Sequence, residues 1–498
     1  MKVLVTGGTG VVGQAAVTEL ARRGHDVRLL SRNAEEDVVQ WASNVEAWPA
    51  NIGAADSVCG CADGCDVVLH AAGIIAEAPP EATFANVNVG GTVNMLREAR
   101  RAGVRRFIYV SSLGAADGES DYHKSKHQAE EHVRGYDGEW IVLRPGNVYG
   151  PGDEVVSLLL KMLRTLPAIP VINGGDDKFQ PLWVGDLALA IAAVVERSDL
   201  NGRTLDLAGN EQTSSNDLID RFTRITKRNP LRIPIPGFLA SGAAALAGMV
   251  GAPLPVNEDQ MTMLMEGNII AENGENALVA VLGITPTTLD DGLKKLADAQ
   301  PEQMPEEGVG SLKRKRIWAD ISGGNLSAEE LFERFRRDFN EATPGTVDAE
   351  TEPGTRCDLE QGATLTMSLP LRGNVQVRVQ EATANKATLI TLAGHPLAGC
   401  VRFLSETRGD QVRFEVQVYD RPANLADWFV MNTVGGAMQN RTWEGLVERM
   451  AAECGGVAAQ GVKQEEETLD EAQAELIEGW LRDLVNERKR GELSGTDS

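Results

Sequence analysis

The chain has 498 residues, of which 42% are hydrophobic and 24% are charged, and its formal net charge is −24. This composition is typical of a globular protein, and it excludes collagen, a wholly disordered chain and a small disulfide scaffold. An acidic surface repels phosphate backbones and aromatic residues make up only 5% of the chain, so we expect no nucleic-acid partner.

The ends and the apolar stretches of the chain bear on its location. The opening residues MKVLVTGGTG contain no basic segment followed by an apolar run, so we expect no signal peptide. The longest apolar stretch, 238–250, is broken by two glycines and is too short to span a bilayer. Six cysteines in so long a chain indicate free thiols in a reducing compartment. These patterns predict a cytoplasmic protein without a transmembrane segment, and they leave its oligomeric state open.

Short apolar runs alternate with helical patterns over the first 150 residues. The runs are rich in Val, Ile and Leu and lack polar alternation, as expected of strands covered on both faces. The pattern predicts an α/β fold with a doubly wound parallel sheet. The predicted strands are 2–6, 26–30, 66–70, 106–111 and 140–144, and the predicted helices are 10–23, 87–101 and 122–134.

Residues 150–299 have a looser pattern than the first 150 residues. We expect helices at 155–163 and 187–196, a Pro-rich break at 230–236 and a closing helix pair within 277–297. The stretch that follows is rich in Pro, Glu and Gly, which is typical of a boundary that few contacts cross. We therefore predict one domain at 1–298 and a linker at 299–312.

The second half predicts a separate α+β domain at 313–455. A helix begins near Ser327, which forms a capping-box pattern with Glu330. Five strands separated by turn residues follow, at 364–369, 374–381, 387–393, 401–406 and 412–419. A long helix at 424–452 closes the domain. Residues 456–498 form an acidic tail with an amphipathic helix. We expect that helix to be capped by Thr468 and Glu471 and to pack through Ala472, Leu476, Trp480 and Leu484.

A glycine-rich loop, TGGTGVVG, links the first strand to the first helix. Gly7 permits a tight turn, Gly10 lets a diphosphate approach the backbone, and Gly13 lets the helix pack closely on the strand. The diphosphate would lie at the N-terminus of the helix, against free N–H donors. The loop therefore predicts a Rossmann-type dinucleotide site. Its contacts would come from Gly7, Thr9, Gly10, Val11, Val12 and Gly13.

The end of the second strand bears on the choice of cofactor. NAD sites usually carry an acidic residue there, whereas this chain has Ser31 and Arg32. An arginine fork can pair with a 2′-phosphate and the serine can donate a second hydrogen bond. We therefore expect NADP as the cofactor, with NAD as the alternative. Asp37 lies too far along the chain for us to expect that it replaces the usual acid.

Tyr122 and Lys126 lie four residues apart, so on a helix they share one face. An ammonium beside a phenol favours the phenolate, and we expect it to lower the pKa of Tyr122 toward neutrality. Such a phenol serves as a general acid or base for an alcohol and carbonyl pair. Ser112 follows a predicted strand at the edge where ligands bind, with Ser111 as the alternative.

Several motifs occur in order: TGGTGVVG, DVVLHAAG, NVNVGGT, YVSS, YHKSK and LRPGNVYGPGD. Together they resemble the extended or atypical short-chain dehydrogenase/reductase superfamily, over about residues 1–298. The resemblance implies that Ser112, Tyr122 and Lys126 are catalytic and that Tyr122 and Lys126 also contact the cofactor. It further implies cofactor contacts by Ala71, Ala72, Gly73, Asn88, Pro145 and Gly146.

Two other segments extend this resemblance. Residues 253–270 resemble the branch that includes an accessory subunit of NADH:ubiquinone oxidoreductase, in which many members bind nucleotide without known turnover. Residues 180–186 resemble the substrate-side segment of extended members, where Trp183 either lines the pocket or is a buried structural residue. The resemblance also implies a small substrate lobe within the domain at 1–298. Because Tyr122 and Lys126 are present, we expect an NAD(P)-dependent oxidoreductase or epimerase/dehydratase-like enzyme that transfers a hydride between a nicotinamide and a carbonyl or alcohol carbon of a small molecule. The alternative is an inactive NAD(P)-binding sensor or scaffold.

Other clusters predict structure rather than chemistry. Cys59, Cys61 and Cys65 lack the usual zinc spacing, so we interpret them as buried thiols and expect no metal. We interpret the basic run 313–316 as a structural one and His123 as a helix-surface residue. The domain at 313–455 loosely resembles helix-grip domains of the START/polyketide-cyclase kind. It would hold either an apolar ligand or an ordinary filled core.

Overall fold

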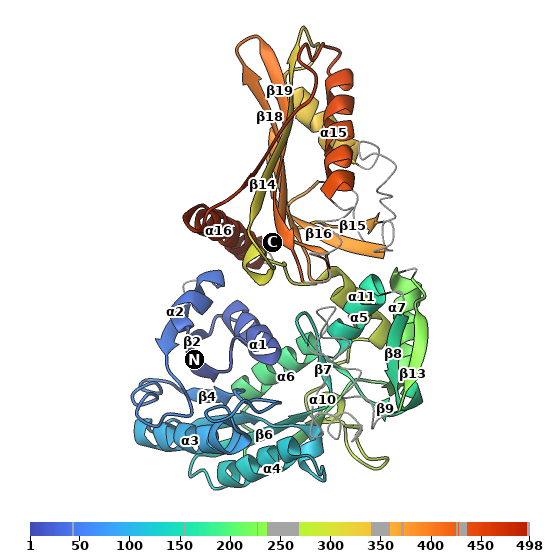
Figure 1. Ribbon diagram of the computed structural model, residues 1–498. Coiled ribbons are helices and arrows are strands. Elements are labelled where there is room, and N and C mark those ends of the chain that lie inside the picture. The colour runs from blue at the N-terminus through green and yellow to red at the C-terminus, as the bar shows by residue number, and fades with distance from the viewer. Residues whose placement is uncertain are drawn as a thin grey trace.

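In the computed structural model, two sheets organise the chain (Figure 1). A parallel sheet wrapped by helices lies in the lower part of the view, and a long antiparallel sheet stands above it. None of the described helices combines the length and apolar character that crossing a membrane requires. The structure describes residues 1–41, 44–153, 155–166, 168–226, 228–236, 268–339, 359–369, 373–424, 427 and 436–495.

The first sheet has seven parallel strands in the order β11-β6-β5-β4-β1-β2-β3, which confirms the predicted doubly wound fold. The strand order reverses between β1 and β4, where such sheets bind ligands. The two edge strands, β3 and β11, were not predicted because their sequences alternate with polar residues. The strands are β1 (Lys2–Thr6), β2 (Asp26–Ser31), β3 (Val45–Pro49), β4 (Val67–His70), β5 (Arg106–Val110), β6 (Glu139–Pro145) and β11 (Arg203–Leu207).

Helices cover both faces of this sheet. On one face α1 (Val11–Arg22) and α6 (Val184–Glu196) pack on residues such as Val5 and Leu29. On the other face α3 (Gly91–Ala102) and α4 (Asp121–Arg134) pack on residues such as Phe107. Short helical turns complete the connections. They are α2 (Ala34–Asp37), η1 (Val38–Gln40), η2 (Ala85–Gly90) and η3 (Leu113–Ala115).

Apart from α6, β11 and the residues around 277–278, which pack on the first sheet, the chain between β6 and the second sheet builds a lobe around its own core, which includes Leu160, Phe222 and Leu293. The break expected at 230–236 is wrong, because β13 (Leu231–Ile235) pairs in parallel with β8 (Ala168–Ile172). The prolines are tolerated because, within the described part of the chain, β13 pairs on one side with β8 and its other side needs no hydrogen bonds. The other elements are β7 (Val148–Tyr149), α5 (Val156–Thr165), η4 (Asn173–Gly175), β9 (Lys178–Phe179), β10 (Leu182–Trp183), β12 (Thr213–Ser214), α7 (Ser215–Thr226), α10 (Ala277–Ala280) and α11 (Leu289–Asp298).

The second sheet has seven antiparallel strands in the order β15-β16-β17-β18-β19-β14-β20. Helices α12 (Ala328–Arg337) and α15 (Gly436–Glu453) cover one face, and α16 (Glu471–Gly495) covers part of the other (Figure 1). The predicted capping box of Ser327 and Glu330 is confirmed. The strands are β14 (Lys313–Ser322), β15 (Thr364–Leu369), β16 (Gly373–Ala382), β17 (Lys386–Thr391), β18 (Leu397–Arg408), β19 (Gln411–Pro422) and β20 (Lys463–Thr468).

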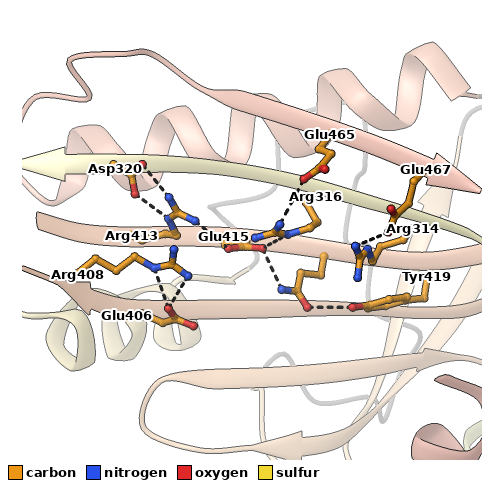
Figure 2. A network of polar contacts seen from close by, with 11 residues as sticks. Arg314, Arg316, Asp320, Glu406, Arg408, Arg413, Glu415, Tyr419, Glu465 and Glu467 are labelled. Atoms are coloured by element: carbon orange, nitrogen blue, oxygen red, sulfur yellow. Dashed lines mark hydrogen bonds and ion pairs between the residues drawn. The ribbon is translucent and has the colours of Figure 1, made fainter. Parts of the chain in front are cut away.

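The basic run 313–316 lies inside β14 and faces the acidic strand β20. Lys313 pairs with Glu466 at 3.0 Å and Arg316 pairs with Glu465 at 3.3 Å. Figure 2 shows how arginines and glutamates alternate across β14, β18, β19 and β20. Opposite charges on facing strands stabilise a pairing, so the basic run has a structural role within the sheet.

The tail helix α16 differs from its prediction in its cap and in part of its packing stripe. Asp470 and Gln473 form its reciprocal cap, at 2.9 and 3.1 Å, whereas Thr468 is still part of β20. The buried apolar side chains of the helix are Leu481 and Val485. Of the predicted stripe, Trp480 and Leu484 pack against this cluster, whereas Ala472 is exposed and Leu476 is 74% exposed. The prediction is therefore confirmed for the second half of the stripe and wrong for the first.

The stretch 299–312 is packed against the second sheet. Gln300 and Gln303 are buried, and the backbone N–H of Gln303 donates to the carbonyl of Thr391 at 2.7 Å. The short turn η6 (Pro305–Glu307) contacts β18 and β19. The two sheets are also joined where α16 contacts η1 and β16 contacts α5. The predicted boundary is therefore a docked segment rather than a free spacer.

Candidate active site

The loop between β1 and α1 holds three glycines with different surroundings. Gly7 has φ +73°, and a Cβ there would stand 2.6 Å from the backbone nitrogen of Ala72. A Cβ at Gly13 would stand 2.0 Å from the carbonyl oxygen of Gly7. The fold itself therefore requires both glycines. A Cβ at Gly10 would meet only that same carbonyl oxygen, at 3.6 Å, so the space in front of Gly10 is open.

This open space lies at the N-terminus of α1. Gly10 is the N-cap residue, and no side chain of the described residues caps the helix. The first N–H groups of a helix lack partners within it and carry the positive end of its dipole. A diphosphate of a dinucleotide fits such a cradle. The contacts predicted for Thr9, Val11 and Val12 remain predictions, and the geometry here accommodates them.

The end of β2 brings together two residues that the sequence left apart. The hydroxyl of Ser31 donates to the carboxylate of Asp37, so Asp37 lies beside the end of the strand. The six-residue separation did not predict this contact, which forms because the short helix α2 turns the chain back. That Asp37 does not replace the usual acid stays a prediction. Arg32 is exposed next to them. This corner therefore presents one cation and one carboxylate toward the position expected for the adenosine ribose.

The loop after β4 lies against the glycine loop and helix α4. The N–H groups of Ala71 and Ala72 donate to the carbonyl and hydroxyl oxygens of Thr6, at 3.2 and 3.3 Å. A Cβ on Gly73 would stand 3.1 Å from Oδ1 of Asn88 and 3.7 Å from Nζ of Lys126. Three segments predicted to contact the cofactor therefore converge at Gly73.

Asn88 lies in the π-helical turn η2 and is almost fully buried. Its side-chain N–H groups donate to the carbonyl of Ile74 at 3.1 Å and to the hydroxyl of Ser125 at 2.9 Å. Its Oδ1 accepts the N–H of Ile74 at 2.8 Å. Asn88 thus ties the loop after β4 to helix α4.

A buried histidine continues this network beneath the loop. Thr92 donates its hydroxyl proton to the carbonyl of Asn88 at 2.6 Å, so it accepts from Nε2 of His70 at 3.0 Å. Nδ1 of His70 then accepts from the hydroxyl of Thr6 at 2.7 Å. Burial lowers the pKa of His70 to about 3, so the imidazole is neutral. A chain of hydrogen bonds therefore connects the glycine loop to η2.

The predicted catalytic residues meet at the carboxyl edge of the sheet. Ser112 follows β5, and its side chain hydrogen-bonds the half-buried phenol of Tyr122. One turn later Lys126 donates to the carbonyl of Val110 at 2.7 Å, and its Nζ lies 4.5 Å from the ring centroid of Tyr109. The structure brings Ser112, Tyr122 and Lys126 to one corner, beside Gly73.

The pKa values of Tyr122 and Lys126 differ from expectation. Burial raises the pKa of Tyr122 to about 12, and the hydrogen bond from Ser112 opposes that shift only in part. The expectation that Lys126 brings this pKa toward neutrality is wrong here. Burial also lowers the pKa of Lys126 to about 7, with Glu130 opposing, so its own charge is weakly held. The phenol is therefore protonated at neutral pH.

The alternative serine has another partner. The hydroxyl of Ser111 donates to the buried carboxylate of Glu130 at 2.6 Å. Adjacent residues of an extended chain point to opposite sides, so Ser112 is the serine that faces Tyr122.

The loop after β6 positions the predicted nicotinamide-side residues. The N–H of Gly146 donates to the carbonyl of Leu207 at 2.8 Å. A Cβ on Gly146 would stand 2.8 Å from the carbonyl oxygen of Gln180, so this approach requires glycine. Pro145 is buried at the end of β6. Trp183 packs edge-on against Tyr149, with ring centroids 5.4 Å apart, inside the lobe core.

Several other predictions can be placed. His123 is fully buried against Gly114 and its Nδ1 lies 2.9 Å from the hydroxyl of Ser120, so its assignment to the helix surface is wrong. Burial raises the pKa of Cys61 to about 12, and no group of metal-binding side chains occurs among the described residues. Cys59 is exposed, unlike the other two thiols. Most of the segment 253–270 lies outside the described residues.

Sequence reasoning missed three residues that shape this site. Glu130 could have been found from its spacing, four residues after Lys126 on the same helix face. His70 could have been found as a polar residue at the end of an apolar strand. Asp37 gave no signal, because only the turn of α2 brings it to Ser31.

Comparisons with known proteins agree with this architecture. Residues 3–208 match the model of the NAD dependent epimerase/dehydratase family. The chain is 30% identical over 244 residues to "Ceramide reductase" of Caulobacter vibrioides, covering 48% of this chain and 76% of the relative. It is 26% identical over 285 residues to the mitochondrial "NADH dehydrogenase [ubiquinone] 1 alpha subcomplex subunit 9" of Arabidopsis thaliana, covering 54% and 71%.

A third relative matches over a shorter segment. The chain is 34% identical over 184 residues to "3 beta-hydroxysteroid dehydrogenase/Delta 5-->4-isomerase" of Mycobacterium tuberculosis, covering 31% of this chain and 49% of the relative. The parallel sheet, the glycine cradle and these matches lead to one assignment. The chain belongs to the NAD dependent epimerase/dehydratase family.

Proposed function

We propose that this protein is an NAD(P)-dependent oxidoreductase or epimerase-type enzyme that transfers a hydride between a nicotinamide and a carbonyl or alcohol carbon. One observation carries the proposal. The phenol of Tyr122 is hydrogen-bonded to Ser112, with Lys126 one turn away, beside a glycine cradle that fits a dinucleotide. A bound nicotinamide would supply or accept the hydride.

Each side chain has a separate part in this chemistry. The hydroxyl of Ser112 can hydrogen-bond the substrate oxygen and hold it beside Tyr122. The phenol of Tyr122 can donate its proton to that oxygen as the carbonyl becomes an alcohol. The ammonium of Lys126 can favour the phenolate left behind, although burial outweighs this effect in the pKa of Tyr122 itself. Because burial keeps the pKa of Tyr122 at about 12, the phenol holds a proton to donate at neutral pH.

We propose an apolar alcohol or ketone as the substrate. Two relatives are named for ceramide and for a steroid, both of which are largely apolar molecules. A third relative is named as an uncharacterised sugar epimerase, so a sugar is the competing class. A panel containing a ceramide-type ketone, a 3-ketosteroid and a nucleotide sugar separates the two classes.

We propose NADP rather than NAD as the preferred cofactor. The exposed guanidinium of Arg32 supports this, because it can pair with a 2′-phosphate at the end of β2. Asp37 lies beside Ser31 and would repel the same phosphate, so we expect the preference to be modest.

The test of the enzymatic proposal combines binding with turnover. Tyr122→Phe removes the proton donor, so we expect turnover of the panel substrate to fall by about 10²-fold or more with nearly unchanged dinucleotide affinity. Tyr136→Phe is the control, because the Tyr136 hydroxyl donates to the carbonyl of Val104 away from the site. Equal turnover by Tyr122→Phe and wild type would contradict the proposal.

A second candidate function is an NAD(P)-binding sensor or scaffold without turnover. What favours it is the similarity, 26% identity over 285 residues, to a protein named as a subunit of mitochondrial NADH dehydrogenase. Such a protein would bind the dinucleotide stoichiometrically, and in a single-turnover assay it would pass no hydride to any panel substrate.

We propose that residues 1–298 carry the chemistry and that 313–455 is a packed accessory domain. The helix-grip resemblance raised the alternative of an apolar ligand between the second sheet and its helices. The described interior there is filled by aromatic rings, with Phe335 lying 4.9 Å from Phe403 and 5.2 Å from Phe414. Buried thiols such as Cys61 and Cys65 support a reducing, cytoplasmic location.

A further inference from the structure

The deepest charge in the catalytic helix is the carboxylate of Glu130, which is fully buried. Its Oε1 accepts from Ser111 at 2.6 Å and from Nε of Arg144 at 2.8 Å. Its Oε2 accepts from Nη2 of Arg144 and from Nη2 of Arg134, both at 2.7 Å. A buried carboxylate with this many charge-assisted hydrogen bonds is held in one orientation.

The position of Glu130 repeats a spacing on α4. Tyr122, Lys126 and Glu130 are each four residues apart, so they form one stripe along the helix. Each contacts a different group at the end of β5. Tyr122 meets the side chain of Ser112, Lys126 meets the carbonyl of Val110, and Glu130 meets the hydroxyl of the serine between them. The stripe therefore fastens α4 to three consecutive residues of the strand end.

We propose that Glu130 is a positioning residue of this active site, which holds Lys126 in its ammonium form and fixes the end of β5 so that Ser112 meets Tyr122. The proposal rests on the proposed function of Tyr122 and Lys126. Glu130 itself lies behind them and contacts neither the substrate position nor the dinucleotide cradle.

The charges around Lys126 explain why one carboxylate matters. Tyr122 and Glu130 face it from its own helix, Tyr109 faces it from β5, and His70 lies toward it from β4. His70 is neutral and both phenols are protonated at neutral pH. Among these four groups only Glu130 carries a negative charge, and it is the group that opposes the loss of the Lys126 proton.

The two arginines keep Glu130 ionised in a buried place. Burial raises the pKa of Glu130, but hydrogen bonds from Arg144 and Ser111 outweigh burial and hold that pKa below its usual range. Arg144 comes from β6, directly before Pro145. Glu130 thus joins α4, β5 and β6 at the point where all three deliver residues to the site.

The experiment compares Glu130→Gln with Glu131→Gln. Glu131 is the neighbouring, exposed carboxylate of the same helix, so its variant loses the same charge without touching the site. The ionisation of Lys126 is followed by NMR of ¹³Cε-labelled lysine in the full-length protein without cofactor, and Lys126→Arg identifies its signal. We expect the midpoint to fall to lower pH in Glu130→Gln and to stay at its wild-type value in Glu131→Gln.

A conservative variant separates charge from position. Glu130→Asp keeps the charge but is one methylene shorter, so the contacts with Ser111 and Arg144 cannot all form. We expect kcat to fall by about tenfold or more with unchanged dinucleotide affinity, and the Lys126 midpoint to stay near that of wild type. This variant also tests the positioning role if Glu130→Gln fails to fold.

Two results would overturn the proposal. One is a Lys126 midpoint that is the same in wild type and Glu130→Gln, and the other is full kcat in Glu130→Asp. The NMR measurement requires neither substrate nor cofactor. A protein that turns over no substrate would therefore contradict the proposed function, while the Lys126 midpoint would still decide whether Glu130 holds its charge.

Discussion

The side chains of Ser112 and Tyr122 are hydrogen-bonded although ten residues separate them in the sequence. Ser112 stands where β5 ends, and Tyr122 lies in the first turn of α4. The short turn η3 and the loop behind it return the chain to the same edge of the sheet. The hydroxyl and the phenol are thus adjacent, as the proposed sharing of one substrate oxygen requires.

Ser112→Ala should weaken catalysis more than binding. The variant removes the hydrogen bond that opposes the burial-raised pKa of Tyr122, and it removes a partner for the substrate oxygen. We expect kcat to fall by about 10²-fold, as for loss of one preorganised donor. Steady-state kinetics with dinucleotide calorimetry measures both effects. A variant with wild-type kcat would contradict the role of Ser112.

Alanine substitutions at two glycines of the first loop should affect folding stability and dinucleotide binding differently. Gly13→Ala places a Cβ 2.0 Å from the carbonyl oxygen of Gly7, so we expect a lower melting temperature together with lost dinucleotide binding. In Gly10→Ala the new Cβ stands 3.6 Å from that oxygen, which is an ordinary van der Waals contact, so we expect a nearly unchanged melting temperature. The same Cβ occupies the space expected for the diphosphate, so we expect weaker dinucleotide binding. Thermal unfolding and calorimetry on both variants test this pair. Unchanged affinity in Gly10→Ala would place the diphosphate elsewhere.

The corner at the end of β2 should set the cofactor preference. Asp37→Asn removes a negative charge beside Ser31, so we expect tighter NADPH binding with little change for NADH. Arg32→Gln should weaken NADPH selectively. Glu35→Gln is the control, because it removes an exposed carboxylate from the same short helix. The ratio of the two dissociation constants is the measurement. If Glu35→Gln changes this ratio as much as Asp37→Asn does, the effect belongs to the general field of the helix.

Local patterns were sufficient for much of the fold and of the site. The buried strands of the first sheet are continuous apolar runs, and β1, β2 and β5 were each predicted to within one residue. The glycine loop and the Tyr122–Lys126 spacing also depend only on neighbours in the chain. Such features could be predicted because strand, turn and helix signals are local.

The remaining features depend on contacts between distant segments. Half of the residues of strand β20 are glutamates, and the strand forms because β14 offers basic partners about 150 residues away. The ionisation of Tyr122 depends on burial, which its sequence spacing to Lys126 does not reveal. Asp37 reaches Ser31 only through the turn of α2. In each case the deciding interaction is tertiary.

The buried carboxylate of Glu302 should make the docking of the linker depend on pH. Its Oε1 accepts from Arg378 of β16 and from Arg488 of α16, both at 2.8 Å. Burial raises the pKa of Glu302, but the two arginines outweigh it and lower the pKa to about 2. A carboxyl group whose folded pKa is depressed stabilises the protein above its unfolded pKa, and that stabilisation is lost as pH falls from about 4.5 toward about 2.

Glu302→Gln should therefore be strongly destabilising near neutral pH. It leaves the buried guanidinium groups of Arg378 and Arg488 without their carboxylate, and breaking such a pair costs about 3–5 kcal/mol. Glu306→Gln is the control, because that exposed carboxylate of the same stretch pairs with Arg482 at 3.3 Å and should contribute about 0–1 kcal/mol. Denaturant unfolding at pH 7 and again between pH 5 and 3 measures both differences, and the Glu302 difference should shrink on acidification. Equal losses from the two variants, or a Glu302 difference that is constant with pH, would show that the arginines do not depend on this carboxylate.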